Sequence, residues 1–347
     1  MPWGLDRNKL DFSQTVLWKN TPFPSSVKGL PVAGKSAKVR ARLRGLPLDL
    51  KKSCLLHKFF WSLVLGILLG GVLASPLAAI TKPKWELGLM HIEAFVPHYA
   101  GSNHYYFRSF NFPYGIYRLE SLDVGSAPKL YLELWEDIHL ELALGIELPV
   151  EADSANATAP TRATDATAVL VRDKNYTRRG MANQQALLGV GAKLAWYAND
   201  HLTLSAPYLN KRTLGGGLVN VGNNYSLRAV FDLFDRNSDY TLGGGYTLDY
   251  GDEGFNQFYY GVPATDALSD RSAYDAPAGL ISRNEHVFAS AQITSRLTLY
   301  GASYRTKLHD AVVRDSPLVV TKENQSFVWG IRYAFWQSSE TVNRLEK

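Results

Sequence analysis

The chain beyond residue 80 alternates between large apolar side chains and polar or small ones. Residues 138–148 show this most clearly, because every even position from Ile138 to Leu148 is apolar. The odd positions hold His139, Glu141, Ala143, Gly145 and Glu147. A period of two predicts β-strands. About ten residues with one continuous apolar face suit a strand that crosses a bilayer, although a soluble β-sandwich shows the same alternation.

The lengths of the connections help to separate these two architectures. Twelve strands are expected, at residues 85–97, 106–118, 119–125, 128–136, 138–150, 186–197, 201–210, 217–232, 239–250, 286–295, 297–307 and 326–336. Short connections alternate with long ones at 151–185, 251–285 and 308–325. Outer-membrane barrels have short periplasmic turns and long external loops, and an open edge in lipid would leave backbone groups unpaired. The sequence therefore predicts an all-β fold, a closed antiparallel transmembrane β-barrel of about twelve strands, or ten if residues 119–136 are irregular.

An export signal is expected ahead of the strands. Lys51, Lys52 and Lys58 precede an uncharged run from residue 59 to residue 81, and small residues follow its apolar centre. This order is typical of a secretory signal peptide, with cleavage after Ala79 or Ala74. A transmembrane anchor helix, which needs about 20 apolar residues, is the alternative. We expect a basic leader at 1–50 that is disordered or not translated, a signal peptide at 51–79, the barrel at 80–336 and a periplasmic tail at 337–347.

The charge divides along the same boundary. The chain has a formal net charge of +5 and a pI near 9.0. Residues 1–80 carry twelve basic and three acidic side chains, whereas the remainder carries 25 basic and 29 acidic ones. A basic chain can bind nucleic acid, but here the excess lies in the segment that export would remove, so no nucleic-acid partner is expected. The single cysteine, Cys54, lies in the same segment, which excludes an internal disulfide framework.

Two groups of polar residues are candidates for chemistry. His139, Glu141 and Glu147 share one strand face and would suit a metal ion or a proton relay, but polar residues also line barrel interiors. Five acidic residues could offer oxygen ligands to a divalent cation or could simply be solvated loop charge. They are Asp249, Asp252, Glu253, Asp266 and Asp270. Neither Gly-x-Ser-x-Gly nor His-Glu-x-x-His occurs, so we expect no catalytic residues, cofactor or metal, with an outer-rim hydrolase as the alternative.

Six stretches of the sequence resemble a known family. They are Trp85-Glu-Leu-Gly-Leu89, Phe112-Pro-Tyr-Gly-Ile-Tyr-Arg118, Arg178-Arg-Gly-Met181, Phe258-Tyr-Tyr-Gly-Val262, Ala273-Tyr-Asp-Ala-Pro-Ala-Gly279 and Arg314-Asp-Ser-Pro-Leu318. In order and spacing they are similar to the MipA/OmpV family of MltA-interacting outer-membrane proteins, over nearly all of 84–336. The motif residues are Arg178, Arg179, Gly180, Met181, Tyr260, Gly261, Val262, Tyr274, Asp275, Asp315, Ser316 and Pro317.

The resemblance implies a β-barrel in the outer membrane of a Gram-negative bacterium, in contact with outer-membrane lipid. For the founding type it implies a scaffold that links a murein-degrading lytic transglycosylase to a murein synthase, while other members are discussed as porin-like or adhesive proteins. A scaffold is therefore expected, with a narrow channel as the alternative. The last strand resembles the signal read by the barrel-assembly machinery during insertion, although the chain continues past it to Lys347. Its residues are Phe327, Trp329, Ile331, Tyr333 and Phe335.

Overall fold

The computed structural model describes residues 81–118, 122–124, 129–159, 169–234 and 239–343. The expected leader and signal peptide, with both cleavage positions at Ala74 and Ala79, lie outside the described residues. No helix in the described part of the chain is long and apolar enough to cross a bilayer.

The long strands form one large antiparallel sheet. The order of its antiparallel strands is β2, β16, β15, β14, β13, β12, β11, β10, β6, β5, β4 and β3, and β2 also pairs with β3; the two-residue strand β8 (Leu170–Val171) adds a parallel pairing to β3. Each of the twelve expected ranges overlaps one of these strands, so the all-β antiparallel architecture is confirmed. The strand bounds are β2 (Trp85–Pro97), β3 (His104–Arg118), β4 (Leu122–Val124), β5 (Lys129–Trp135), β6 (Ile138–Glu147), β10 (Leu187–Tyr197), β11 (Leu202–Thr213), β12 (Asn220–Asp232), β13 (Tyr240–Gly251), β14 (Gly279–Gln292), β15 (Leu297–Lys307) and β16 (Glu323–Gln337).

The region after β13 differs from the prediction. β14 begins at Gly279 instead of residue 286, so the expected connection 251–285 is shorter than predicted. It also contains helix α3 (Glu253–Tyr260) and the short helix η2 (Ala264–Asp266). Asp252 starts α3 because its side chain accepts a hydrogen bond from the backbone N–H of Phe255 at 2.8 Å. An eight-residue helix makes little more than two turns, which is too short to leave a clear period in the sequence.

The exposed fractions of alternate side chains along β6 show which face of the sheet is exposed. Leu144 is 50% exposed and Ile146 is 72% exposed, whereas His139 is 5% and Glu141 is 6% exposed. Opposed residues of an antiparallel pair share a face, and Leu144 opposes Val190 of β10. We call this exposed side the outer face and the opposite side the inner face. Large apolar residues lie outside and polar residues inside, which is the reverse of the usual arrangement in a soluble sheet.

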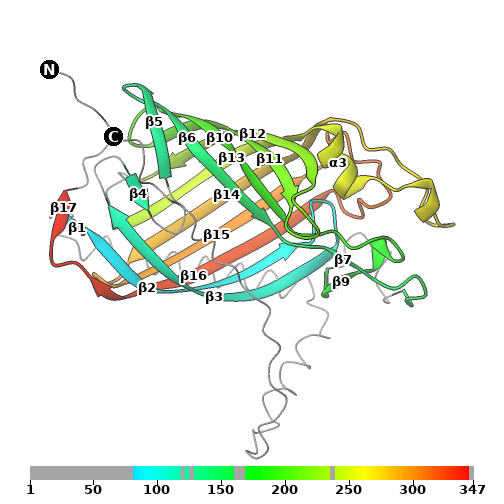
Figure 1. Ribbon diagram of the computed structural model, residues 1–347, viewed down its shortest axis with the longest axis horizontal. Helices are drawn as coiled ribbons and strands as arrows, with labels where there is room; N and C mark the ends of the chain where they lie inside the picture. The colour runs from blue at the N-terminus through cyan, green and yellow to red at the C-terminus, as the bar shows by residue number, and fades with distance from the viewer. Residues whose placement is uncertain (1–80, 119–121, 125–128, 160–168, 235–238, 344–347) are drawn as a thin grey trace, which may run out of the picture. The chain divides into compact units, whose positions relative to one another are not determined.

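The two ends of the strands differ in their connections (Figure 1). At the turn end, strands follow one another after the short segments 136–137, 198–201 and 293–296, and β1 (Thr81–Pro83) pairs with β17 (Thr341–Asn343). The loop end carries the long connections 148–186, 252–278 and 308–322, with α3 among them. The predicted alternation of short and long connections is confirmed. The smaller elements at the loop end are η1 (Tyr176–Arg178), β7 (Glu151–Ala152), β8 (Leu170–Val171) and β9 (Lys174–Asn175).

An apolar core lies at the loop end, where α3 and the long connections pack together. Burial of each leucine, valine, isoleucine or phenylalanine side chain in this core contributes roughly 1.5–3 kcal/mol to the free energy of folding, which offsets the loss of chain entropy in the loops. A second cluster on the inner face joins Met90, Tyr114, Ile116 and Ala334. The residues of the loop-end core are Tyr99, Val150, Leu187, Phe255, Tyr259, Tyr260, Val262, Ala276, Ile281, Leu308, Ala311, Val313 and Leu318.

Candidate functional site

A buried lysine and a glutamate meet on the inner face beside α3. Lys211 of β11 donates to one carboxylate oxygen of Glu147 at the end of β6, and the hydroxyl of Tyr259 donates to the other. The Lys211 side chain is 4% exposed. Gly189 of β10 makes room for it, because an added Cβ there would lie 3.0 Å from Cδ of Lys211. Burial, and next the nearby Glu147 carboxylate, raise the pKa of Tyr259 well above its ordinary value, so the hydroxyl remains a donor.

Glu141 and His139 lie on the same inner face, as predicted, but each has partners of its own. Glu141 accepts hydrogen bonds from Nζ of Lys193 at 2.6 Å and from the hydroxyl of Tyr197 at 2.6 Å. The ring of His139 meets the ring of Tyr197 edge-on, with centroids 5.0 Å apart. Glu147 and Glu141 are therefore neutralised by two different lysines. This arrangement favours a polar interior lining over a shared metal site.

Three of the five acidic residues considered for a divalent cation have separate roles. Asp249 of β13 accepts a hydrogen bond from Oγ of Ser226 at 2.5 Å. Asp252 caps α3, and Asp270 pairs with Arg179. Among the residues that the structure describes, no three His, Cys, Asp or Glu side chains gather in a group that could hold a metal ion.

Several family-motif residues converge on the C-terminal end of α3. The last carbonyl groups of a helix have no partner inside it and carry partial negative charge. Nη1 of Arg178 donates to the carbonyl oxygen of Tyr259 at 3.2 Å, and Oγ of Ser316 donates to that of Tyr260 at 2.6 Å. Nε2 of Gln184 donates to the carbonyl oxygen of Phe258. Three side chains from two distant connections therefore donate hydrogen bonds to the last carbonyl oxygens of the helix.

Burial alters the ionisation of this region. Arg178 is 4% exposed, and desolvation lowers the pKa of its guanidinium from the ordinary value. Burial also raises the pKa of Tyr260, whose hydroxyl donates to the carbonyl oxygen of Ala100 at 3.1 Å. The Tyr260 ring therefore fixes both the helix and the β2–β3 connection. These contacts build the loop-end core.

Other motif residues shape the backbone around this core. Val262 and Tyr274 exchange two backbone hydrogen bonds of 2.9 Å, and the Tyr274 hydroxyl donates to the carbonyl oxygen of Val312 at 3.2 Å. Gly180 has a φ of +75°, a conformation that favours glycine, and Met181 packs against the core. Of the remaining motif residues, Asp275 and Asp315 are exposed and Pro317 is half-buried. Gly261 follows α3 as its C-terminal cap.

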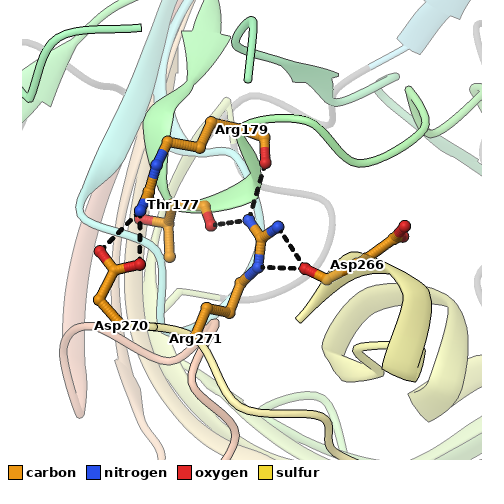
Figure 2. Close-up of polar contacts among 5 residues, drawn as sticks. All are labelled: Thr177, Arg179, Asp266, Asp270 and Arg271. Atoms are coloured by element: carbon orange, nitrogen blue, oxygen red, sulfur yellow. Dashed lines mark hydrogen bonds and ion pairs between the residues drawn. The ribbon is translucent and has the colours of Figure 1, made fainter. Parts of the chain in front are cut away.

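Arg271, which the sequence did not single out, holds two connections together (Figure 2). Its Nη1 donates to the carbonyl oxygens of Thr177 at 2.9 Å and Arg179 at 3.0 Å. Its Nη2 and Nε donate to the carbonyl oxygen of Asp266 at 2.7 and 3.2 Å. The neighbouring Asp270 pairs with Nη2 of Arg179. The alternation of an acid and a base at 270 and 271 is the only sequence signal, and it is too common to identify this role.

The residues of the expected assembly signal lie on the outer face of β16. Trp329 is 40% exposed, Tyr333 is 41% and Phe335 is 45% exposed. Phe327 opposes Phe95 of β2, and a bulge follows Ala334. Ile331 belongs to the same alternation. The predicted face is therefore present, while its reading by the assembly machinery stays a prediction.

A cavity of about 320 Å³ lies on the inner side of the loop end. Two carboxylates, Glu147 and Asp249, belong to its lining, and so do Tyr106, Asn224 and Ser282. No lysine or arginine belongs to this lining among the described residues. The cavity is thus a small space between the sheet and the packed connections, with a mostly apolar and aromatic lining that carries two carboxylates.

Comparison with known proteins identifies one family and several distant structures. The family model described as "MltA-interacting protein MipA" matches residues 93–335. No curated protein matches the sequence.

The solved structures with some similarity have TM-scores too low to define a shared fold. Pseudomonas putida OprB is 13% identical, with 65% of this chain and 49% of that chain covered and a TM-score of 0.27. A FadL homologue from Pseudomonas aeruginosa is 13% identical, with 68% and 65% covered and a TM-score of 0.27. The COG4313 outer membrane channel from Pseudomonas putida F1 is 12% identical, with 76% and 100% covered and a TM-score of 0.30. The match thus spans less than two thirds of the first two proteins.

Proposed function

Because the chain belongs to the MipA family of MltA-interacting proteins, we propose that it is an integral outer-membrane β-barrel of a Gram-negative bacterium that acts as a scaffold for cell-wall enzymes. It would have no catalytic activity of its own. Its partners would be outer-membrane lipid, the barrel-assembly machinery during insertion, and a lytic transglycosylase and a murein synthase at the periplasmic side.

The exposed apolar face of the sheet is the observation that supports a membrane location. Side chains such as Leu144, Ile146, Leu194 and Leu227 are between 45% and 72% exposed. A leucine or isoleucine side chain left in water lacks roughly 1.5–3 kcal/mol of burial free energy, and such side chains are exposed on several strands of this sheet. Contact with lipid chains removes this cost of exposing apolar side chains to water, while the polar inner face does not contact lipid.

The strand pairings support a barrel of twelve strands. β2 pairs with β16 on one side and with β3 on the other, so the first long strand meets the last. An even number of strands returns the C-terminus to the side of the N-terminus, and β1 indeed pairs with β17. With an export signal ahead of residue 80, the turn end would face the periplasm.

The packed loop end favours the scaffold over an open pore. The core around α3 lies at the end of the strands, and the Lys211–Glu147–Tyr259 group attaches that helix to the inner face. The turn end offers a docking surface of short turns with the β1–β17 ribbon. Two ion pairs hold this ribbon, Lys82 to Asp239 and Lys84 to Glu340, both at 3.1 Å.

Site-specific crosslinking in cells tests the scaffold. A photoreactive residue in place of Ala198 would report on the turn end, and one in place of Asp275 on the loop end. We expect Ala198 to capture a lytic transglycosylase or a murein synthase and Asp275 to capture neither. Capture of only the assembly machinery at Ala198 contradicts the scaffold.

A narrow channel is the alternative, and the charged inner face supports it. Lys193, Glu141, Lys211 and Glu147 place two ion pairs on the inner face, and a polar interior of this kind is found in channels. Conductance in planar bilayers separates the two functions. A steady ohmic current supports a channel, whereas a silent protein that is folded and inserted supports the scaffold.

A further inference from the structure

Two neighbouring strands, β2 and β3, carry a group of polar side chains on the outer face of the sheet (Figure 1). His91 and Glu93 of β2 oppose Asn111 and Ser109 of β3 in the register of this pair. Glu93 also opposes Trp329 of β16, which is 40% exposed on the outer face, so the four polar residues share that face. We call these four residues the polar patch.

The polar patch lies within the apolar band of the outer face. Along β2 this face continues with Phe95 on the loop side of the patch and with Leu89 and Leu87 on the turn side, where Leu89 is 40% and Leu87 is 48% exposed. The outer face of β6, by contrast, is apolar from Leu140 to Ile146 without interruption. The patch therefore interrupts the apolar band instead of marking its edge.

Within one chain the patch uses only part of its hydrogen-bonding capacity. Nδ1 of His91 lies 2.8 Å from Oδ1 of Asn111, whereas Nε2 of His91 lies 3.6 Å from Oε1 of Glu93, which is longer than a hydrogen bond. Among the residues that the structure describes, none forms a hydrogen bond with the Glu93 carboxylate, the Asn111 amide nitrogen or the Ser109 hydroxyl. One acceptor group and two donor groups are therefore available at the surface.

Polar groups in this position are unfavourable against lipid. Ionisable side chains within a membrane almost always face a polar interior or pair with other polar groups, because lipid chains offer neither donors nor acceptors. The patch faces outward, so the polar inner face of the sheet cannot satisfy it. Hydrogen bonds between two membrane-spanning elements satisfy such groups without water. The patch therefore suits contact with a second polar surface inside the bilayer.

We propose that the polar patch is the centre of an interface between two copies of this chain in the membrane. The patch holds an acceptor and donors side by side, so it is complementary to itself, and a twofold axis along the bilayer normal places the two patches face to face. Because Glu93 lies directly opposite Ser109, the two lie at similar depths, and Glu93 of one copy accepts from Ser109 and Asn111 of the other. This proposal rests on the membrane location proposed above, but not on the scaffold role.

Chemical crosslinking in phosphatidylcholine vesicles tests the interface. In the full chain with its only cysteine, Cys54, changed to alanine, Ser109→Cys places a thiol in the patch. Ala192→Cys, at an exposed outer-face position of β10, is the matched control, because β10 is adjacent to neither β2 nor β3. With a bis-maleimide and a large excess of lipid, we expect several-fold more crosslinked dimer from position 109 than from position 192. Equal yields, or a ladder of trimers and larger products, overturn the twofold interface.

Removal of the acceptor tests the role of Glu93. Glu93→Leu should lower the fraction of dimer several-fold, because the donors of the other copy lose their carboxylate. Gln325→Leu removes a polar outer-face side chain of β16 outside the patch and should leave the fraction unchanged. Photobleaching steps of a dye on Ala192→Cys count the copies in each vesicle. An unchanged fraction of dimer in Glu93→Leu overturns the interface; if that variant fails to fold, the crosslinking comparison decides, because Glu93 is intact there.

Flotation of the vesicles separates failure of the interface from failure of the membrane location. Protein that floats with the vesicles and bleaches only in single steps overturns the interface alone. Protein that does not float with the vesicles overturns the membrane location and the interface with it. Protein that floats and bleaches mainly in two steps supports both.

Discussion

Arg178 donates a hydrogen bond to the carbonyl oxygen of Tyr259 over 3.2 Å, from a position 81 residues earlier in the chain. The contact joins the connection after β6 to the end of α3. A positive side chain at the C-terminal end of a helix also opposes the partial negative charge of its last carbonyls. The last turn of α3 has no basic residue of its own, so Arg178 supplies this charge.

Replacement of Arg178 should loosen the loop end without unfolding the sheet. Arg178→Met removes a charged hydrogen bond from a buried acceptor, which costs about 1–3 kcal/mol. We expect faster amide hydrogen exchange across 253–262 and unchanged exchange in β10 and β11. Arg314→Met, at an exposed arginine, is the matched control. Identical exchange in the two variants would show that Arg178 does not hold the helix.

Lys211 and Glu147 should behave as a coupled pair. Lys211→Met leaves the Glu147 carboxylate without its cation in a mostly buried site, and we expect a loss of roughly 1–3 kcal/mol in the free energy of unfolding. Glu147→Gln in the same chain should recover part of that loss, because no unpaired charge remains. Urea unfolding of the two single variants and the double variant measures the coupling. Strictly additive losses would contradict the pair.

Charge on the outer face should be tolerated much less than charge on the inner face. Leu144→Arg places a guanidinium among lipid chains, which costs about 2–4 kcal/mol near the middle of the bilayer. Ala143→Arg places the same group on the inner face beside Glu141. We expect a lower yield of heat-modifiable, folded protein for Leu144→Arg than for Ala143→Arg after refolding into vesicles. Equal yields would argue for a soluble sheet.

Acidification should destabilise the loop end through His98. Burial lowers the pKa of His98 from 6.5 to about 4 in the folded protein. Between these two values the unfolded chain binds a proton that the folded chain does not, so the free energy of unfolding falls as the pH falls from 6.5 towards 4. The loss should shrink in His98→Gln. The imidazole resonances of His98 measure the pKa, and a midpoint near 6.5 would contradict the prediction.

The strands could be predicted because their pattern is local. Leu140, Leu142 and Leu144 share a face because alternate residues of a strand always do, whatever the register of that strand with its neighbours. The alternation of short and long connections was visible in the same way. Alternation alone did not give the outward position of the apolar face, because a soluble sandwich shows the same alternation; the pattern of short and long connections favoured it.

The loop end could not be predicted because its contacts join distant parts of the chain. The tight spacing of Arg178, Gly180 and Met181 says nothing of Tyr259, and Arg271 follows Asp270 in a stretch with no period.

The sequence by itself determined the strands, the side chains that share a face and the end at which the long connections gather, because side-chain alternation and turn length act over a few residues. Only the tertiary structure decided that α3 folds against the inner face and that Lys211 reaches Glu147 across β10. These features depend on contacts between residues that are far apart in the sequence. A buried backbone group or carboxylate can be satisfied by many different donors, so the packing decides which one it pairs with.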